Sequence, residues 1–185
     1  MIEPNDYDDC IATPTLAIMG QFDQRMNTPE ALALMMGTVA QESDMGRYLK
    51  QKGDGPAIGA PQVEPATHQS LWGHYLSRPS KRKLALLIAD LAPGWTVKWD
   101  DTGDGSRSVH SVHNDALHEP RYCFAIARLK YWPKTRPIPA LDDHVGRADY
   151  WDVFYNANGK PQIGEFLHSW DTWLKRWRGY APTQL

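Results

Sequence analysis

The sequence has 185 residues, of which 42% are hydrophobic and 23% are charged, a composition typical of a globular protein with a buried core. The formal net charge of -2 does not favour a nucleic acid or an acidic membrane surface as partner. The two cysteines, Cys10 and Cys123, are too few and too far apart for a disulfide framework or a thiolate metal cluster. No apolar stretch is long enough to span a membrane, and no segment near the N-terminus has the pattern of a secretory signal.

Start signals and apolar spacing predict two helices in the first quarter of the chain. Thr13 as N-cap and Pro14 at the first helical position predict a helix that runs to about Met26. The segment TPE at residues 28–30 predicts a second start, and that helix should end near Gly46. Four of its residues fall at steps of three and four and share one face: Leu32, Met35, Val39 and Glu42.

The remaining chain also has mainly helical patterns. Residues 51–61 carry three Gly and two Pro, which predicts a loop or a short hairpin. Residues 93–118 are polar and rich in Gly, Asp, Ser and His, which predicts an irregular insertion. Further helices are predicted over Pro65–Leu76, 81–91, Arg121–Tyr131, around Tyr150–Tyr155, and over Gly164–Arg178. We therefore expect a mainly α protein with a single domain over residues 1–185.

The eight tryptophans have flat faces that suit sugar rings, but most are predicted to build the core. The C-terminal helix carries a stripe of four aromatic residues: Phe166, Trp170, Trp173 and Trp177. This stripe is typical of a helix that docks on the core, with nearby basic side chains reaching back to solvent.

Glu42 continues the apolar face of its helix, so its side chain should point inward. A carboxyl group in apolar surroundings keeps its proton, because burial disfavours the charged form. Such a group can act as a general acid near neutral pH, as cleavage of a glycosidic bond requires. The alternative is a solvated carboxylate at the end of a helix, and periodicity alone does not decide between the two.

Four short segments follow one another in a characteristic order. They are AQES at residues 40–43, AIGAPQVEPAT at 57–67, Glu119-Pro120 with the helix over 122–131, and FYNANG at 154–159. Together they resemble the motifs of lytic transglycosylases and goose-type lysozymes, and above all the small lytic-transglycosylase-like proteins of tailed bacteriophages. The resemblance implies a lysozyme-like fold, helical with a small loop or hairpin region, that lines a saccharide cleft.

The resemblance also implies roles for individual residues. Glu42 is the catalytic acid, and Ser43 after it is a substrate-binding or supporting residue. Gly59 lets the backbone approach the sugar, because a side chain there would fill the cleft. Gln62 offers a donor and an acceptor to an N-acetyl or hydroxyl group. Tyr155 hydrogen-bonds or packs on Glu42 and fixes its rotamer.

For Asn156 the resemblance implies that it binds the substrate's acetamido group or holds the turn after Tyr155. The third segment departs from the family pattern, with Cys123 and Ala127 where Asn and Gly are usual. In the second segment Ala60-Pro61 replaces Leu-Met, and in the fourth Asn158 is an additional residue. No substrate contact is therefore carried over to the third segment.

The chemistry implied is cleavage of the β-1,4 bond between N-acetylmuramic acid and N-acetylglucosamine in peptidoglycan, with formation of a 1,6-anhydro ring. This reaction needs one carboxyl group and no cofactor. A hydrolytic muramidase or endolysin would need a second carboxylate, for which Glu64 is the candidate and Asp44 and Asp54 are weaker ones. Glu64 also suits the solvent-facing start of a helix at Pro65.

Outside the enzyme class, the alternative is an inactive virion structural or wall-binding protein that keeps the fold. Without a secretory signal, we expect the protein to be made in the host cytoplasm. It would reach the wall with the phage virion, beside other virion proteins, or as an endolysin. Its partner would be the glycan strand.

No metal ion is predicted. Residues 100–105 match the first half of a calcium loop, but Ser111 stands where a bidentate Glu is required. His110, His113 and His118 lack the second ligand pair of a zinc site.

Overall fold

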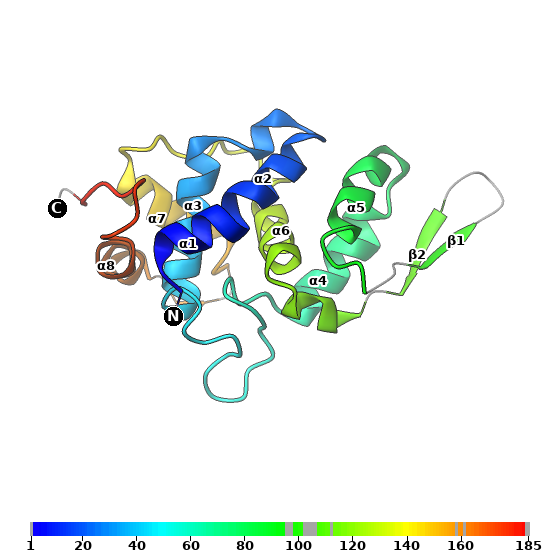
Figure 1. The fold of residues 1–185 in the computed structure, drawn as a ribbon, viewed down its shortest axis with the longest axis horizontal. Helices are drawn as coiled ribbons and strands as arrows, with labels where there is room; N and C mark the ends of the chain where they lie inside the picture. The colour runs from blue at the N-terminus through cyan, green and yellow to red at the C-terminus, as the bar shows by residue number, and fades with distance from the viewer. Residues whose placement is uncertain are drawn as a thin grey trace.

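Helices make up most of the chain, as the sequence predicts, and one two-stranded antiparallel sheet is present among the described residues (Figure 1). The computed structural model describes residues 2–94, 98–101, 107–111, 113–157, 159–160 and 162–183. The elements are α1 (Pro4–Tyr7), α2 (Thr13–Gly20), α3 (Pro29–Ser43), α4 (Pro65–Leu71), α5 (Arg82–Ala89), β1 (Lys98–Asp101), β2 (Arg107–Ser111), α6 (Pro120–Tyr131), α7 (His144–Phe154) and α8 (Ile163–Trp173).

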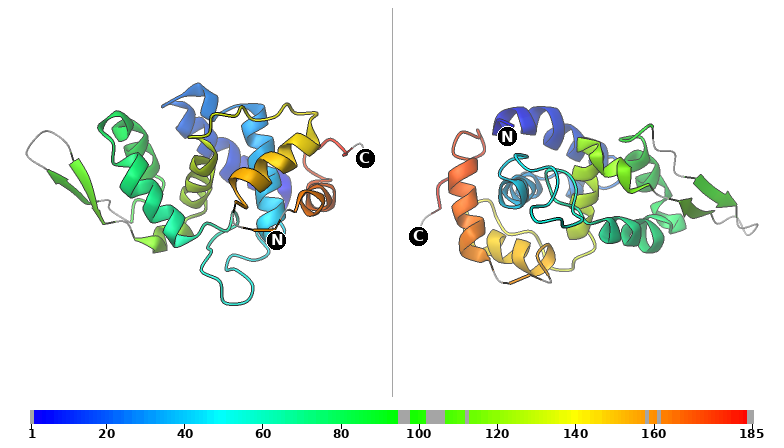
Figure 2. Two further views of the ribbon diagram at one scale, coloured as in Figure 1. Left: turned by 180° about the vertical axis from the view of Figure 1, so that it is seen from behind. Right: turned by 90° about the horizontal axis from the view of Figure 1, so that it is seen from below.

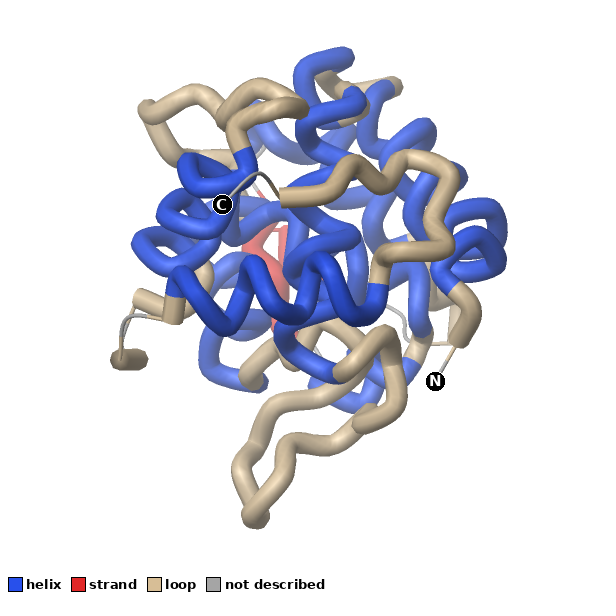
Figure 3. Tube along the Cα trace, turned by 90° about the vertical axis from the view of Figure 1, so that its left-hand side faces the viewer, coloured by secondary structure: helices blue, strands red, loops and turns tan. Residues whose placement is uncertain are grey.

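Helix α6 lies between two groups of helices (Figures 1 and 2). On one side α3 packs against α7 and α8, and on the other α4 and α5 contact α6. The loop of residues 44–64 extends beyond the helices at the lower edge of Figure 1, and the same projection is visible in Figure 3. This loop begins where α3 ends, so it brings a long polar segment next to Glu42.

Helix α3 begins and ends where its capping residues require. The Thr28 hydroxyl accepts a hydrogen bond from the Ala31 amide at 3.2 Å, which confirms the predicted N-cap. Nearly the whole helix is buried. It ends at Ser43, because Asp44 (φ 52°), Met45 (φ 56°) and Gly46 (φ 73°) are left-handed. Glu42 therefore occupies the last turn of a buried helix.

The first helix begins earlier than predicted, and Thr13 is not its N-cap. Helical backbone runs from Pro4 through a π-helical segment, Asp8–Ala12, to Gly20. The Thr13 amide bonds the Asp8 carbonyl five residues back, and its hydroxyl donates to the Asp8 carboxylate. This wide turn precedes Pro14, whose nitrogen has no hydrogen to donate. A Thr-Pro pair inside a helix therefore resembled a helix start.

The polar stretch of residues 93–118 was predicted to be irregular, and that prediction is wrong in part. Strands β1 and β2 pair within it, with Trp99 opposite Val109 and Asp101 opposite Arg107. Each strand carries a single apolar residue, Trp99 or Val109, so neither shows the alternation of apolar and polar residues that predicts a strand. Residues 95–97, 102–106 and 112 lie outside the described residues, and so does most of the calcium pattern at 100–105.

The C-terminal aromatic stripe packs into the core as predicted, although α8 ends at Trp173 rather than near Arg178. Trp170 and Trp177 are buried, and their indole N–H groups donate to the Ala181 carbonyl and the Asp8 carboxylate, both at 2.8 Å. None of the helices in the described ranges combines the length and the hydropathy that crossing a bilayer requires.

Replacing Gly37 with Ala should destabilise the contact between α3 and α8. A Cβ atom at Gly37 would lie 2.5 Å from Phe166 Cζ and 3.2 Å from Trp170 Cε3. Because both rings are buried, we expect a loss of about 1–3 kcal/mol in the free energy of unfolding, measured with urea. Gly164→Ala is the matched control, since no atom lies within 4 Å of a Cβ there. Equal stability of the two variants would contradict this packing.

Candidate active site

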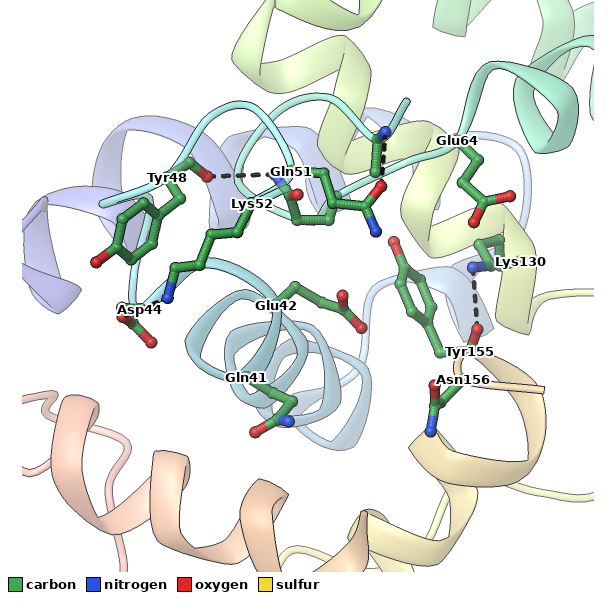
Figure 4. A pocket seen from close by; sticks show the side chains of 12 residues that line it. Gln41, Glu42, Asp44, Tyr48, Gln51, Lys52, Glu64, Lys130, Tyr155 and Asn156 are labelled. Atoms are coloured by element: carbon green, nitrogen blue, oxygen red, sulfur yellow. Dashed lines mark hydrogen bonds and ion pairs between the residues drawn. The ribbon is translucent and has the colours of Figure 1, made fainter. Parts of the chain in front are cut away.

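A polar cavity of about 380 Å³ lies where the last turn of α3, the loop of residues 44–64, α6 and the end of α7 meet (Figure 4). Five of the seven residues predicted from the sequence line it: Glu42, Gln62, Glu64, Tyr155 and Asn156. Ser43 and Gly59 are not among the lining residues. The others that line it are Gln41, Asp44, Tyr48, Gln51, Lys52, Ala57 and Lys130.

Glu42 is half-buried on the wall of this cavity. Its Oε1 accepts a hydrogen bond from the Trp151 indole N–H at 3.1 Å. Burial raises the pKa of Glu42 from its ordinary value of 4.5 to about 7, and the nearby Glu64 charge also raises it, while Lys130 and the Trp151 hydrogen bond lower it. The carboxyl group therefore exchanges its proton in the range where a general acid is most effective.

Lys130 brings a positive charge from α6 to the same cavity. Its Nζ donates to the Tyr155 carbonyl at 3.1 Å and lies 3.5 Å from the centroid of the Tyr155 ring. Burial lowers the pKa of Lys130, whereas the charges of Glu42 and Glu64 raise it. One ammonium group thus interacts with two carboxyl groups. Its attraction lowers the pKa of Glu42 by less than burial raises it.

Tyr155 does not hydrogen-bond Glu42, although this was one of its two predicted contacts. Its hydroxyl donates to the Pro61 carbonyl at 2.7 Å, so it ties the end of α7 to the loop of residues 44–64. The ring stacks on Tyr131, with 5.3 Å between centroids. The charge of Glu42 nonetheless raises the pKa of Tyr155, after burial as the main cause, so the two side chains are neighbours across the cavity.

Gln62 and Gly59 form the turn that shapes the loop side of the cavity. Gln62 has a left-handed φ of 52°, and its amide Nε2 donates to the carbonyls of Gly59 (2.8 Å) and Tyr48 (3.2 Å). Its donors thus hold the loop, rather than being left for a ligand as predicted.

The predicted reason for Gly59 is wrong. Its φ is +77°, and a Cβ atom there would lie 2.5 Å from the Cys123 sulfur on α6, so a side chain would collide with the core rather than fill the cleft. Burial raises the pKa of the Cys123 thiol to about 12, and the thiol donates to the Ile58 carbonyl at 3.4 Å. The altered third segment therefore serves the packing of the loop on α6.

Ser43 and Asn156 hold local backbone. The Ser43 hydroxyl donates to the Val39 carbonyl at 3.1 Å and accepts from the Gly46 amide at 2.8 Å, which stabilises the end of α3. Asn156 donates to the Asp152 carboxylate at 2.9 Å and the Lys160 carbonyl at 2.8 Å. This agrees with the second of its two predicted roles, holding the turn after Tyr155.

Glu64 stands at the N-cap position of α4 and is exposed, without a side-chain capping bond. In Figure 4 its carboxylate and that of Glu42 lie on opposite sides of the cavity. Its place before a helix fits the solvent-facing interpretation, and its place in the cavity lining keeps it available to a ligand.

Two important residues were not predicted from the sequence, Trp151 and Lys130. Trp151 precedes Tyr155 by one helical turn, which places both on the same face of α7. That spacing was the available signal, but a tryptophan is more often a core residue, and Trp151 is also buried. Lys130 follows the apolar run of α6 and carries no local signal of its own.

Among the described residues, no group of three or more His, Cys, Asp or Glu side chains is arranged to hold a metal ion. The side chain of His110 is outside the described part of the chain, His113 precedes the short 3-10 helix Asn114–His118, and His118 is its last residue.

Replacing Glu42 with Gln should stabilise the protein increasingly as the pH rises. The folded state holds the Glu42 proton up to about pH 7, whereas the unfolded chain releases it near pH 4.5. Wild-type stability should therefore fall between these two values relative to Glu42→Gln, by at most about 3 kcal/mol. Urea unfolding at pH 4.5, 6 and 8 measures the difference. A constant difference at all three values would contradict a buried, proton-holding Glu42.

Comparison with known proteins identifies no relative of this chain. No protein-family model matches it, and no curated protein and no solved structure matches it significantly. The resemblance of the four segments to lytic transglycosylases therefore stays a prediction. The function has to be argued from the cavity and its carboxyl group.

Proposed function

We propose that this chain is a lytic transglycosylase that cleaves the β-1,4 bond between N-acetylmuramic acid and N-acetylglucosamine in peptidoglycan. One observation carries the proposal: Glu42 lies on the wall of a polar cavity, where burial raises the pKa of its carboxyl group to about 7. The amides and hydroxyls around it, from Gln41, Gln51 and Tyr48, suit a ligand rich in hydroxyl and acetamido groups. The resemblance of the four segments supports the same substrate.

In the first step Glu42 acts as the general acid. Because Oε1 accepts the Trp151 N–H, the acid proton resides on Oε2. Oε2 gives this proton to the oxygen of the glycosidic bond, the bond from that oxygen to C1 of the muramyl residue breaks, and N-acetylglucosamine leaves with a free 4-hydroxyl. The substrate's own acetamido oxygen stabilises the positive charge that develops at C1.

In the second step the ionised Glu42 acts as the base. Lys130 and the Trp151 N–H both stabilise the carboxylate, so that it persists long enough to accept a proton. It takes this proton from the C6 hydroxyl of the muramyl residue, whose oxygen bonds to C1 and closes the 1,6-anhydro ring. Glu42 is protonated again at the end, and no water is consumed.

Hydrolysis is the second candidate, since Glu64 lines the same cavity as Glu42. An inverting hydrolase would use Glu64 to activate a water molecule on the opposite face of the sugar, with the two carboxyl groups about 6.5–9.5 Å apart. The products separate the two reactions, because hydrolysis adds one water to the muramyl end. An inactive wall-binding protein would give no product at all.

The place of action is part of the same proposal. The segments resemble those of small proteins of tailed phages, and we propose that this protein is carried by the virion and opens the host wall during entry. Release late in infection, as an endolysin, is the alternative.

Digestion of purified peptidoglycan should yield muropeptides that end in 1,6-anhydromuramic acid, and Glu42→Gln should reduce their release at least 100-fold, because the general acid is lost. Mass spectrometry of the released fragments measures both. Glu165→Gln is the matched control, because it makes the same exchange at an exposed glutamate outside the cavity lining. Reducing muramyl ends would establish the hydrolase instead, and absence of product from folded wild type on several walls would refute the enzyme.

Replacing Lys130 with Met should move the alkaline limb of the pH profile of kcat/KM to higher pH. Loss of the cation raises the pKa of Glu42, so the acid stays protonated further into the alkaline range. Lys52→Met is the control: Lys52 lines the cavity but lies by the Asp44 carboxylate and the Tyr48 ring. If both variants left the limb where wild type has it, Lys130 would have no electrostatic effect on the acid.

A further inference from the structure

A second and larger cavity, of about 980 Å³, lies beside the start of α3. Its walls come from the turn after α2, the end of the π-helical segment Trp72–Leu76 with the turn before α5, and the segment of residues 132–140 after α6. Figure 1 shows these segments along the upper edge, whereas the end of α3 and the loop of residues 44–64 lie at the lower edge. The two cavities share no lining residue. About 18 Å of helix separates Glu30 in one from Glu42 in the other.

This second cavity is strongly basic, although the whole chain has a net charge of -2. Its two acidic lining residues are Asp23 and Glu30. Asp23 already accepts three hydrogen bonds from the Arg25 guanidinium group. Six of its lining residues are cationic: Arg25, Arg78, Lys81, Arg128, Lys134 and Arg136. Arg136 is already ion-paired with Asp149, so the excess of positive charge rests on Arg78, Lys81, Arg128 and Lys134.

Arg128 is the most unusual of these cations, because it is 1% exposed. Among the described residues, its guanidinium donates only to two neutral carbonyls, those of Met26 and Arg25, both at the long distance of 3.4 Å. Burial without a carboxylate partner lowers the pKa of Arg128 to about 10. A buried charge of this kind is costly unless an anion comes close to it.

Within the described residues, no carboxylate forms an ion pair with Arg78, Lys81 or Lys134 either. Aromatic rings hold these cations in place. Lys81 lies 5.2 Å from the Phe22 ring and 5.3 Å from the Tyr75 ring. Arg78 lies 5.9 Å from the Tyr75 ring. Ordered cations lose less freedom when they bind a ligand.

The Trp132 ring orders two further cations of this cavity, Arg25 and Arg128. The guanidinium groups of Arg25 and Arg128 lie 5.4 Å and 5.7 Å from its ring centroid. Guanidinium groups match the geometry of phosphate oxygens and bind them through paired hydrogen bonds. The volume is also in the range of sites for small organic ligands.

We propose that this cavity is a binding site for a small ligand that carries a phosphate or diphosphate group, with Arg128 at its floor and Arg78, Lys81 and Lys134 around the anion. The site is independent of the reaction proposed at Glu42, since the two cavities have separate linings. The chain would then bind a second ligand, which the site recognises by its negative charge, whereas the cavity at Glu42 recognises the hydroxyl and acetamido groups of a sugar.

Isothermal titration calorimetry with inorganic pyrophosphate tests the proposal at pH 7 and low salt. Wild type should bind it, and Arg78→Gln should bind about tenfold more weakly, because a charge-assisted hydrogen bond is lost. The matched control is Arg82→Gln, an exposed arginine four residues further on and outside the lining. Glu42→Gln should bind as wild type does, which separates this site from the proposed enzymatic activity.

Arg128→Lys keeps a cation at the floor but removes the planar fork, and should weaken binding while circular dichroism confirms the fold. Two results would overturn the proposal. One is no heat of binding for wild type at millimolar pyrophosphate. The other is equal affinity of Arg78→Gln and Arg82→Gln, which would mean nonspecific attraction to surface charge.

Discussion

The structure of the site depends on one hydrogen bond, from the indole N–H of Trp151 to the carboxyl group of Glu42. Glu42 stands in the last turn of a helix that is buried almost throughout, where an isolated carboxylate would be too costly. The N–H fixes one carboxyl oxygen and leaves the other for the proton. To deliver that N–H, α7 has to pack against α3, and the contacts of both with α8 keep it there.

The groups around Glu42 reduce the rise in its pKa that burial causes, but they do not cancel it. A direct ion pair with a lysine would stabilise the carboxylate and abolish its ability to act as an acid at neutral pH. Lys130 instead bonds the Tyr155 carbonyl and shares its charge between Glu42 and Glu64. The Tyr155 hydroxyl meanwhile ties the loop to α7 through Pro61. The position of the loop and the proton affinity of Glu42 thus depend on different contacts, so a substitution can change one without the other.

The sequence was sufficient for the parts of the fold that local chemistry determines. The start of α3 at Thr28, its end close to Gly46 and its inward face all follow from neighbours along the chain, and they place Glu42 correctly. The membership of Gln62 and Tyr155 in one cavity came only from the resemblance of short segments. The roles of their polar groups could not be foreseen, because the carbonyls that they bond belong to a loop of irregular backbone.

Contacts between distant segments account for what was missed. Gly59 is constrained by Cys123, sixty-four positions later, and nothing near Gly59 in the sequence indicates that packing. Trp151 is one of eight tryptophans, and its bond to a residue on another helix has no local signature. The most direct measurement of the central claim is an NMR titration of the Glu42 carboxyl carbon in the folded protein. A midpoint of about 7 is expected, and a midpoint near 4.5, the ordinary value, would contradict the account.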